Sequence, residues 1–227
     1  MEIIIGDTKF KLNKPQVLGV VGNYLSFLSD LSTNKNVGYI KKNEYYFTNY
    51  VYDELLLSLN KYDRKLNDYD KRIKKVLEVF HLEDEFLDKE ISNLSKGEKR
   101  LLSYLRVFIY NPKIILVDEP FKNLDYKYEK LVINYLRELK NKYNKTIIIA
   151  SNNVNVIYEN TDKTLIIGDE VVFDDTKDIF TNDDILKKYN LYVPNLVMFV
   201  KLAAKKDKKI EYHNDIRDLM KDVYRNV

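Results

Sequence analysis

Runs of consecutive apolar residues alternate along this chain with segments whose apolar positions recur at helical spacing. Continuous apolar runs, typical of strands buried on both faces, occupy residues 16–21, 37–40, 113–118 and 146–150. Between the last two runs lies an amphipathic segment, 128–143, with apolar residues every three or four positions. Strand, helix and strand in that order predict an α/β fold whose parallel sheet has helices on both faces.

Two turn sequences predict hairpins outside this pattern. Residues 1–12 contain two short strand-like segments around Gly6-Asp7, and residues 164–173 contain two more around Gly168-Asp169. A short polar or glycine-containing turn between two such segments is the signal of a β-hairpin. We therefore expect antiparallel strands at the N-terminus and again late in the chain.

Two further regions are expected to be helical. From about residue 50 apolar residues recur at helical spacing among charges, and one such helix is expected over 95–110. His81 ends an apolar stripe in this region, so we expect a partly buried packing residue. Beyond about residue 182 the chain is helical and highly charged, and Pro194 suits the first position of a helix.

Composition excludes several classes of function. Lys and Arg number 38 against 35 Asp and Glu, which is too nearly balanced for a nucleic-acid binder. Cysteine is absent and only two histidines occur, which excludes thiolate and multi-histidine metal sites. There is no apolar run of about 18 residues and no signal peptide, so we expect a soluble chain that reaches a membrane only through a partner.

A pair of carboxylates, Asp118 and Glu119, ends the apolar run 113–118. Open α/β folds bind their ligands at this carboxyl edge of the sheet. In phosphate chemistry an aspartate there holds Mg²⁺, often through water, and an adjacent glutamate polarises the attacking water. The alternative is a strand that simply ends in polar residues, with Pro120 stopping it.

Ser95-Lys96-Gly97-Glu98 begins the helix predicted over 95–110. A serine and a glutamate three residues apart form a capping box, in which each side chain accepts from the other residue's amide. The same helix start, with free amides and the positive end of the dipole, binds a phosphate presented from outside. Both interpretations require the same geometry, and the capping hydrogen bonds would break when a phosphate binds.

The segment 93–100, followed by Asp118-Glu119 and Asn123-Leu124-Asp125, resembles the second half of an ABC-type ATPase. The resemblance implies a P-loop-NTPase-like, mostly parallel sheet core with an inserted helical subdomain, antiparallel N-terminal strands and a C-terminal helical extension. It implies ATP and Mg²⁺ as cofactors. In this family the signature segment is Leu-Ser-Gly-Gly-Gln and contacts the γ-phosphate of ATP held by the opposite subunit. The resemblance places Asp118 at Mg²⁺, Glu119 at the attacking water, Asp125 near the nucleotide, and Ser95, Lys96, Gly97 and Glu98 at the partner's phosphate.

The first half of the family pattern fails at the phosphate loop. That loop reads Gly-x-x-x-x-Gly-Lys-Ser/Thr, and its amides and lysine hold the phosphates. Counting from Gly22 puts Phe27, Leu28 and Ser29 at the last three positions, so only Gly22 and Ser29 match. We expect the site built on this loop to be dead or nearly so. The alternative is an ordinary strand, turn and helix with its apolar residues packed inward: Leu25, Leu28 and Leu31.

Two other family positions are also altered. Asn152 stands where the family has a switch histidine, and it can donate to phosphate but cannot carry a proton. Lys42 stands where the family has a glutamine that reaches the metal, and its charge would oppose Mg²⁺ there. Phe10 is the one aromatic residue before Gln16 that could stack on adenine.

The resemblance covers roughly residues 1–180, and we expect an ATPase-like domain over 1–181 with its helical subdomain at about 45–111. The remaining segment, 182–227, contains Leu191-Tyr192-Val193-Pro194 and Asp215-Ile216-Arg217-Asp218-Leu219. These look like the C-terminal extension of energy-coupling-factor ATPases, which import vitamins and metal ions. Such an extension suits dimerisation or partner contact.

The family implies a subunit on the cytoplasmic face of the membrane, bound to a second ABC ATPase subunit and to an integral membrane transporter subunit. Because the phosphate loop is degenerate, we expect one half of an asymmetric ATPase pair, which lends its signature helix to the partner's ATP site. Two alternatives stay open: a homodimeric ATPase with an unconventional phosphate loop, and an ABC-derived structural or regulatory subunit that binds no nucleotide.

Overall fold

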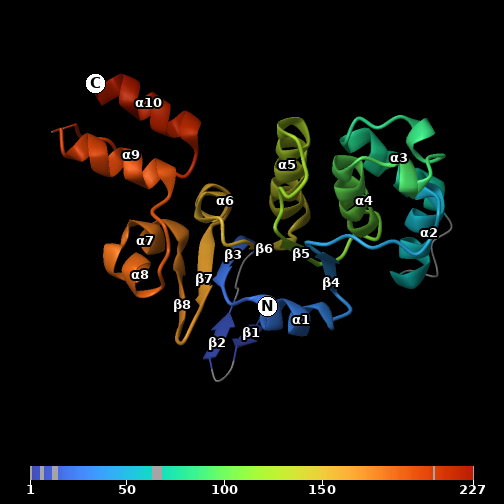
Figure 1. Ribbon diagram of the computed structural model, residues 1–227, viewed down its shortest axis with the longest axis horizontal. Coiled ribbons are helices and arrows are strands. Elements are labelled where there is room, and N and C mark those ends of the chain that lie inside the picture. The colour runs from blue at the N-terminus through green and yellow to red at the C-terminus, as the bar shows by residue number, and fades with distance from the viewer. Residues whose placement is uncertain (1, 6–7, 12–14, 63–67, 207, 227) are drawn as a thin grey trace. The chain divides into compact units, whose positions relative to one another are not determined.

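The computed structural model consists of two compact units, residues 1–28 with 148–227 and residues 29–147. The elements of both are labelled in Figure 1. The structure describes residues 2–5, 8–11, 15–62, 68–206 and 208–226.

The first unit is built on β3 (Val17–Gly22), which runs parallel to β7 (Lys163–Ile167), with Val20 opposite Leu165. The strand β8 (Val171–Asp175) then runs antiparallel to β7, which confirms the late hairpin. The end of β6 (Thr146–Ala150) lies on the other side of β3. Because β3 is buried along almost its whole length, its sequence is a continuous apolar run.

The N-terminal hairpin is also present in this unit. The strand β1 (Glu2–Ile5) pairs antiparallel with β2 (Thr8–Lys11). The predicted turn Gly6-Asp7 lies outside the described residues, as does the side chain of Phe10.

In the described residues of the first unit, the helices that follow β6 are α6 (Val154–Asn160), α7 (Thr176–Thr181), α8 (Asp183–Lys188), α9 (Asn195–Ala204) and α10 (Ile216–Asn226). The helix α6 packs closely on β3, because a Cβ added at Gly19 would lie 2.6 Å from Ile157 Cγ2. Pro194 precedes α9 as its N-cap instead of occupying its first helical position. The helical character expected beyond residue 182 is confirmed.

The second unit contains β4 (Val37–Ile40), which is parallel to β5 (Ile114–Asp118). Between these strands the chain forms α2 (Val51–Tyr62), α3 (Tyr69–Val79), two short 3₁₀ turns, η1 (Asp84–Phe86) and η2 (Ile91–Asn93), and α4 (Lys96–Phe108). The helices α2, α3 and α4 pack together (Figure 1). After β5 comes α5 (Tyr126–Tyr143), the amphipathic helix predicted between two apolar strands.

His81 lies just after α3 and forms part of its C-terminal cap, which the apolar stripe did not reveal. Its φ is 53°, and its amide donates to Glu78 while the amide of Leu82 donates to Leu77. These bonds form a Schellman motif, in which the residue after the helix adopts a left-handed conformation. His81 is exposed, so the expectation of a partly buried packing residue is wrong: Phe80, at 0% exposure, closes the stripe.

The predicted fold class is confirmed: the strands are mostly parallel, an antiparallel pair precedes them, helices separate β4 from β5, and further helices follow β8. Within the described part of the chain, no helix has both the length and the apolar character that crossing a bilayer requires.

Candidate functional site

The connection between β3 and α1 (Leu25–Ser32) contains only Asn23 and Tyr24. Gly22, at the end of β3, has φ of 92°, and its amide donates to Oδ1 of Asn152 over 2.8 Å. The amide of Asn23 donates to the carbonyl of Ile167 over 2.8 Å. A phosphate loop presents its amides to the ligand. Here the first two amides already have protein acceptors.

The side chains that follow do not supply a charge either. Leu28, at the position of the family's lysine, is 0% exposed, and Ser29 lies in the second turn of α1, where it is exposed. Leu25 is 67% exposed, so its predicted inward packing is wrong: Tyr24 and Phe27 are the residues buried beside Leu28. These residues lack the lysine and two of the free amides with which a phosphate loop binds a triphosphate.

Asn152 follows β6, and its contact with Gly22 brings the predicted switch position and the phosphate-loop glycine together. The next residue, Asn153, caps α6 by accepting from the amide of Asn155 over 3.1 Å. These two residues, Asn152 and Asn153, form the switch segment. The side-chain oxygen of the first binds the end of β3, and that of the second caps α6.

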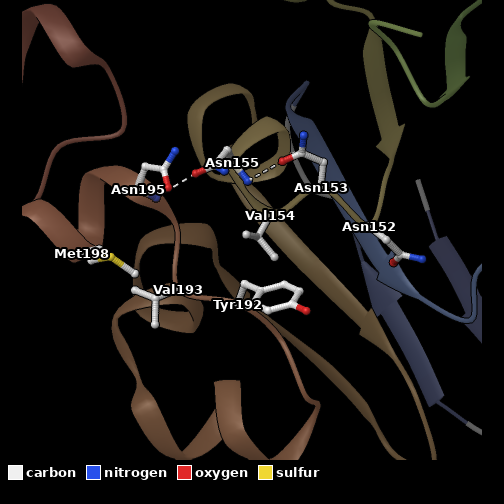
Figure 2. Close-up of a pocket in the computed structure, with 8 residues that line it drawn as sticks. All are labelled: Asn152, Asn153, Val154, Asn155, Tyr192, Val193, Asn195 and Met198. Atoms are coloured by element: carbon white, nitrogen blue, oxygen red, sulfur yellow. Dashed lines mark hydrogen bonds between the residues drawn. The ribbon is translucent and has the colours of Figure 1, made fainter.

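A pocket of about 440 Å³ adjoins this segment (Figure 2). Asn152 and Asn155 line one side, and Tyr192 and Met198 of the C-terminal segment line the other. The amide of Asn195 donates to Oδ1 of Asn155 over 2.7 Å, which ties the start of α9 to α6. Asn152 thus contacts the end of β3, and Asn155, three residues later in α6, contacts the start of α9.

In the second unit Asp118 ends β5 and is 4% exposed. The backbone amide of Lys42 acts to lower the pKa of its carboxyl group, and burial, followed by the charge of Asp118, raises the pKa of Tyr39 to about 12. Burial, followed by the charge of Glu119, raises the pKa of Asp118. Its Oδ1 has no hydrogen-bond partner among the described residues. A buried carboxylate oxygen without a donor fits a water of Mg²⁺, so Asp118 suits its predicted metal role.

Lys42 follows β4, and both its backbone amide and its charge act to lower the pKa of Asp118. Glu119 follows with φ of 50°, a left-handed conformation that costs a non-glycine residue about 1–2 kcal/mol. Such backbone strain clusters at functional sites, where the surrounding structure enforces it.

The signature segment adopts the predicted capping box. Ser95 Oγ accepts from the amide of Glu98 over 3.1 Å, and the amide of Ser95 donates to Glu98 Oε2 over 2.9 Å. The other oxygen of Glu98 accepts from Lys89 Nζ over 2.7 Å. Lys89 and the Ser95 amide lower the pKa of Glu98. The anion that the sequence places near a phosphate is therefore paired with a cation.

Lys96 and Gly97 form the first turn of α4, and Lys96 is exposed. Amides in a first turn have no acceptor within their helix, so those of Lys96 and Gly97 are suited to an outside anion. A Cβ at Gly97 would lie 3.3 Å from the carbonyl of Asn123. Nearby, Asp125 caps α5, and its Oδ1 accepts from the amide of Tyr128 over 2.9 Å. The predicted nucleotide contact of Asp125 would compete with this cap.

Sequence reasoning missed Arg100, which is 0% exposed. It donates to the main-chain carbonyls of Lys41, Asp118 and Glu119, the last two over 2.9 and 2.7 Å. A charged residue at helical spacing normally indicates a solvated face, so no local signal reveals its burial. Lys89 was missed for a different reason: its partner Glu98 lies nine residues away, beyond the η2 turn.

Comparisons with known proteins show which family this chain resembles. Residues 16–122 match the family model described as ABC transporter. A putative ABC transporter ATP-binding protein of Pyrococcus furiosus is 33% identical over 127 residues, which make up 56% of this chain and 47% of the relative. The chain spans about half or less of the length of the curated relatives it matches.

Solved structures show the same fold. A putative metal-chelate type ABC transporter in an inward-facing conformation has a TM-score of 0.68 at 22% identity, over 81% of this chain and 80% of that one. The protein cbiO1 from Clostridium perfringens, part of the ABC transporter complex cbiONQ, has a TM-score of 0.62 at 19% identity, over 86% of this chain and 90% of that one. The expected P-loop-NTPase-like fold is confirmed. Through residues 16–122 the chain is thus similar to ABC transporter ATP-binding proteins, and it has the fold of ABC ATPases.

Proposed function

We propose that this chain is the ATP-binding-cassette subunit of a membrane transporter and acts as the degenerate half of an asymmetric ATPase pair. It binds a second ABC ATPase subunit and an integral membrane subunit on the cytoplasmic face of the membrane. The partner's phosphate loop holds ATP and Mg²⁺, and this chain supplies the signature helix α4 across the interface.

The connection from β3 to α1 carries this proposal. Two residues separate strand from helix, the amides of Gly22 and Asn23 have protein acceptors, and Leu28 is buried where a lysine would neutralise phosphate. A triphosphate needs several free amides and a cation. At that place two of the amides are already bound and no cation replaces the lysine, so on this proposal the contribution of this chain to an ATP site comes from elsewhere.

The start of α4 supports the second half of the proposal. The capping box orders the first turn, and Lys89 offsets the charge of Glu98. The exposed ammonium of Lys96 adds to the positive end of the helix dipole. This helix start remains able to receive the γ-phosphate of a nucleotide held by another subunit.

The C-terminal segment, 182–227, supports a more specific placement in the energy-coupling-factor type. It contains α8, α9 and α10, and the last two helices keep several large apolar side chains exposed: Met198, Phe199, Leu202, Ile216, Met220 and Tyr224. Contiguous exposed apolar surface is typical of interaction sites. We assign this segment to contact with the second ATPase subunit.

One observation favours the second candidate, a homodimeric ATPase with an unconventional loop. The buried Oδ1 of Asp118 has no donor among the described residues, as it would if a hydrated Mg²⁺ belonged there. In that case each chain would bind its own nucleotide, and Glu119 would serve both sites.

The two candidates predict different mutational patterns in the complex purified through a tag on this chain. In the asymmetric pair Ser95→Arg removes nearly all ATP hydrolysis, because it blocks the helix start that meets the partner's phosphate. Glu119→Gln leaves most of the activity, because Glu119 belongs to the degenerate site. Ser92→Arg, at an exposed position three residues before Ser95, is the matched control and retains activity. Loss of activity in Glu119→Gln, or full activity in Ser95→Arg, contradicts the asymmetric pair.

A further inference from the structure

Arg100 is a fully buried arginine in the second turn of the signature helix α4. Burial of an isolated guanidinium is strongly unfavourable, so a buried arginine needs acceptors around it. Its ion pair with Glu44 is long, with 3.7 Å between Nη1 and Oε1. The close acceptors are main-chain carbonyls.

These carbonyls come from two loops that follow parallel strands. Nη1 donates to Lys41, just after β4, and Nη2 donates to Asp118 and Glu119, at the end of β5. One side chain of α4 thereby binds the backbone of both loops that carry predicted metal-side residues.

Tyr104, one turn further along α4, extends the contact. Its hydroxyl donates to the carbonyl of Pro120 over 2.5 Å, and its ring lies 5.2 Å from the guanidinium of Arg100. Three successive carbonyls, those of residues 118, 119 and 120, are therefore bound by two neighbouring side chains of one helix. The left-handed backbone of Glu119 lies within this run, so α4 holds the strained conformation in place.

The contacts also act in the opposite direction. An α-helix start is positioned by whatever its buried side chains bind, and Arg100 is one helical turn from Lys96. The strand end 118–120 therefore fixes where the first turn of α4 lies. It does so through main-chain oxygens, which a change of the Asp118 or Glu119 side chain leaves unaltered.

We infer that Arg100 is a positioning residue for the ATP site formed in trans: it sets the first turn of α4 by binding the carbonyls of Lys41, Asp118 and Glu119. This inference rests on the proposed function, in which α4 meets a partner's phosphate. The carbonyls of Asp118 and Glu119 then hold α4 in place, and this role does not depend on a nucleotide in the degenerate site of this chain.

The first test uses the isolated chain and hydrogen exchange. In Arg100→Met, amide exchange rises at least tenfold at residues 95–99 and at residues 121–124. In Arg100→Lys, which keeps the charge but reaches fewer carbonyls, the rise is smaller in both segments. The matched control is Arg106→Met, on the same helix, because Arg106 pairs with Glu54 and the carbonyl of Tyr45 instead. Equal exchange in Arg100→Met and Arg106→Met at both segments overturns the inference.

The second test measures ATP hydrolysis by the complex purified through this chain. Arg100→Met lowers kcat at least tenfold and changes KM for ATP less than twofold, because the partner's loop binds the nucleotide. Arg100→Lys retains an intermediate kcat. Ser95→Arg distinguishes failure of the proposed function from failure of the Arg100 inference. If Ser95→Arg leaves hydrolysis unchanged, the proposed function itself is defeated. If Ser95→Arg abolishes hydrolysis and both Arg100 variants keep full kcat, only the positioning role of Arg100 is defeated.

Discussion

The backbone amide of Gly22 donates to the side-chain oxygen of Asn152 over 2.8 Å. In an active ABC ATPase the equivalent glycine begins the loop around the phosphates, and the equivalent of Asn152 is the switch histidine. In this chain the two positions satisfy each other. The pairing, together with the short connection from β3 to α1, supports our proposal that this chain has lost nucleotide binding at the level of the backbone as well as the lysine.

Restoring the missing cation should therefore fail. Leu28→Lys places an ammonium at a position that is 0% exposed, and a buried unpaired charge costs several kcal/mol. We expect urea unfolding to show that large loss and ATP titration to show no gain in binding. Ser29→Lys, at the next and exposed position, is the control, with a change within about 0.5 kcal/mol. A stable Leu28→Lys variant that binds ATP would refute this account of the loop.

Gly22 is required for the backbone itself. Its φ is 92°, and an added Cβ would lie 2.2 Å from the carbonyl oxygen of Ile167. Gly22→Ala should therefore lower the free energy of unfolding by about 2 kcal/mol or more.

The control for Gly22→Ala is Gly168→Ala. There an added Cβ would lie 3.1 Å from two ring carbons of Tyr189 and 3.7 Å from the carbonyl oxygen of Glu170, and the half-buried ring is a side chain that can shift. We expect a loss below about 1 kcal/mol. Similar losses at the two glycines, measured by chemical denaturation, would show that the turn after β3 tolerates a side chain.

The capping box of α4 should weaken in acid. Lys89 and the Ser95 amide lower the pKa of Glu98 below its ordinary value of 4.5, so the folded state favours the ionised carboxylate. The stabilisation that Glu98 contributes is then fully present above its pKa in the unfolded state. It is lost as the pH falls through the lowered pKa of Glu98 in the folded state.

Glu98→Ala should accordingly cost about 1 kcal/mol near neutral pH, and less and less as pH falls below 4.5. Glu98→Gln keeps an acceptor for the Ser95 amide but loses the charge that pairs with Lys89, so it should fall between wild type and alanine. Chemical denaturation at several pH values measures all three proteins. A cost of Glu98→Ala that stays constant down to pH 3 would mean that the carboxylate charge does not contribute.

Features that depend on short spacing were predictable from the sequence. The capping box needs only Ser95 and Glu98 three residues apart, and the apolar runs at β4 and β5 need no knowledge of their neighbours. Arg100 could not be predicted in this way, because its acceptors lie 18, 19 and 59 residues away and are main-chain atoms that every sequence has.

The turn after β3 was predicted only in part. The absence of the lysine was plain, and Leu28 is buried as the alternative expected. The exposure of Leu25 was not foreseen, because helical spacing allowed either Leu25 or Tyr24 to face inward. Tyr24 and Phe27 are the buried residues, and no local feature of the sequence decides which side of the helix faces the core.

The central claim is that this chain does not hold ATP by itself. It is tested most directly by titrating the purified isolated chain with Mg-ATP, beside an ABC ATPase with an intact phosphate loop. We predict no saturable binding to this chain up to cellular ATP concentration, while the comparison protein saturates. Saturable binding that Gly22→Ala or Ser29→Arg weakens would contradict the claim.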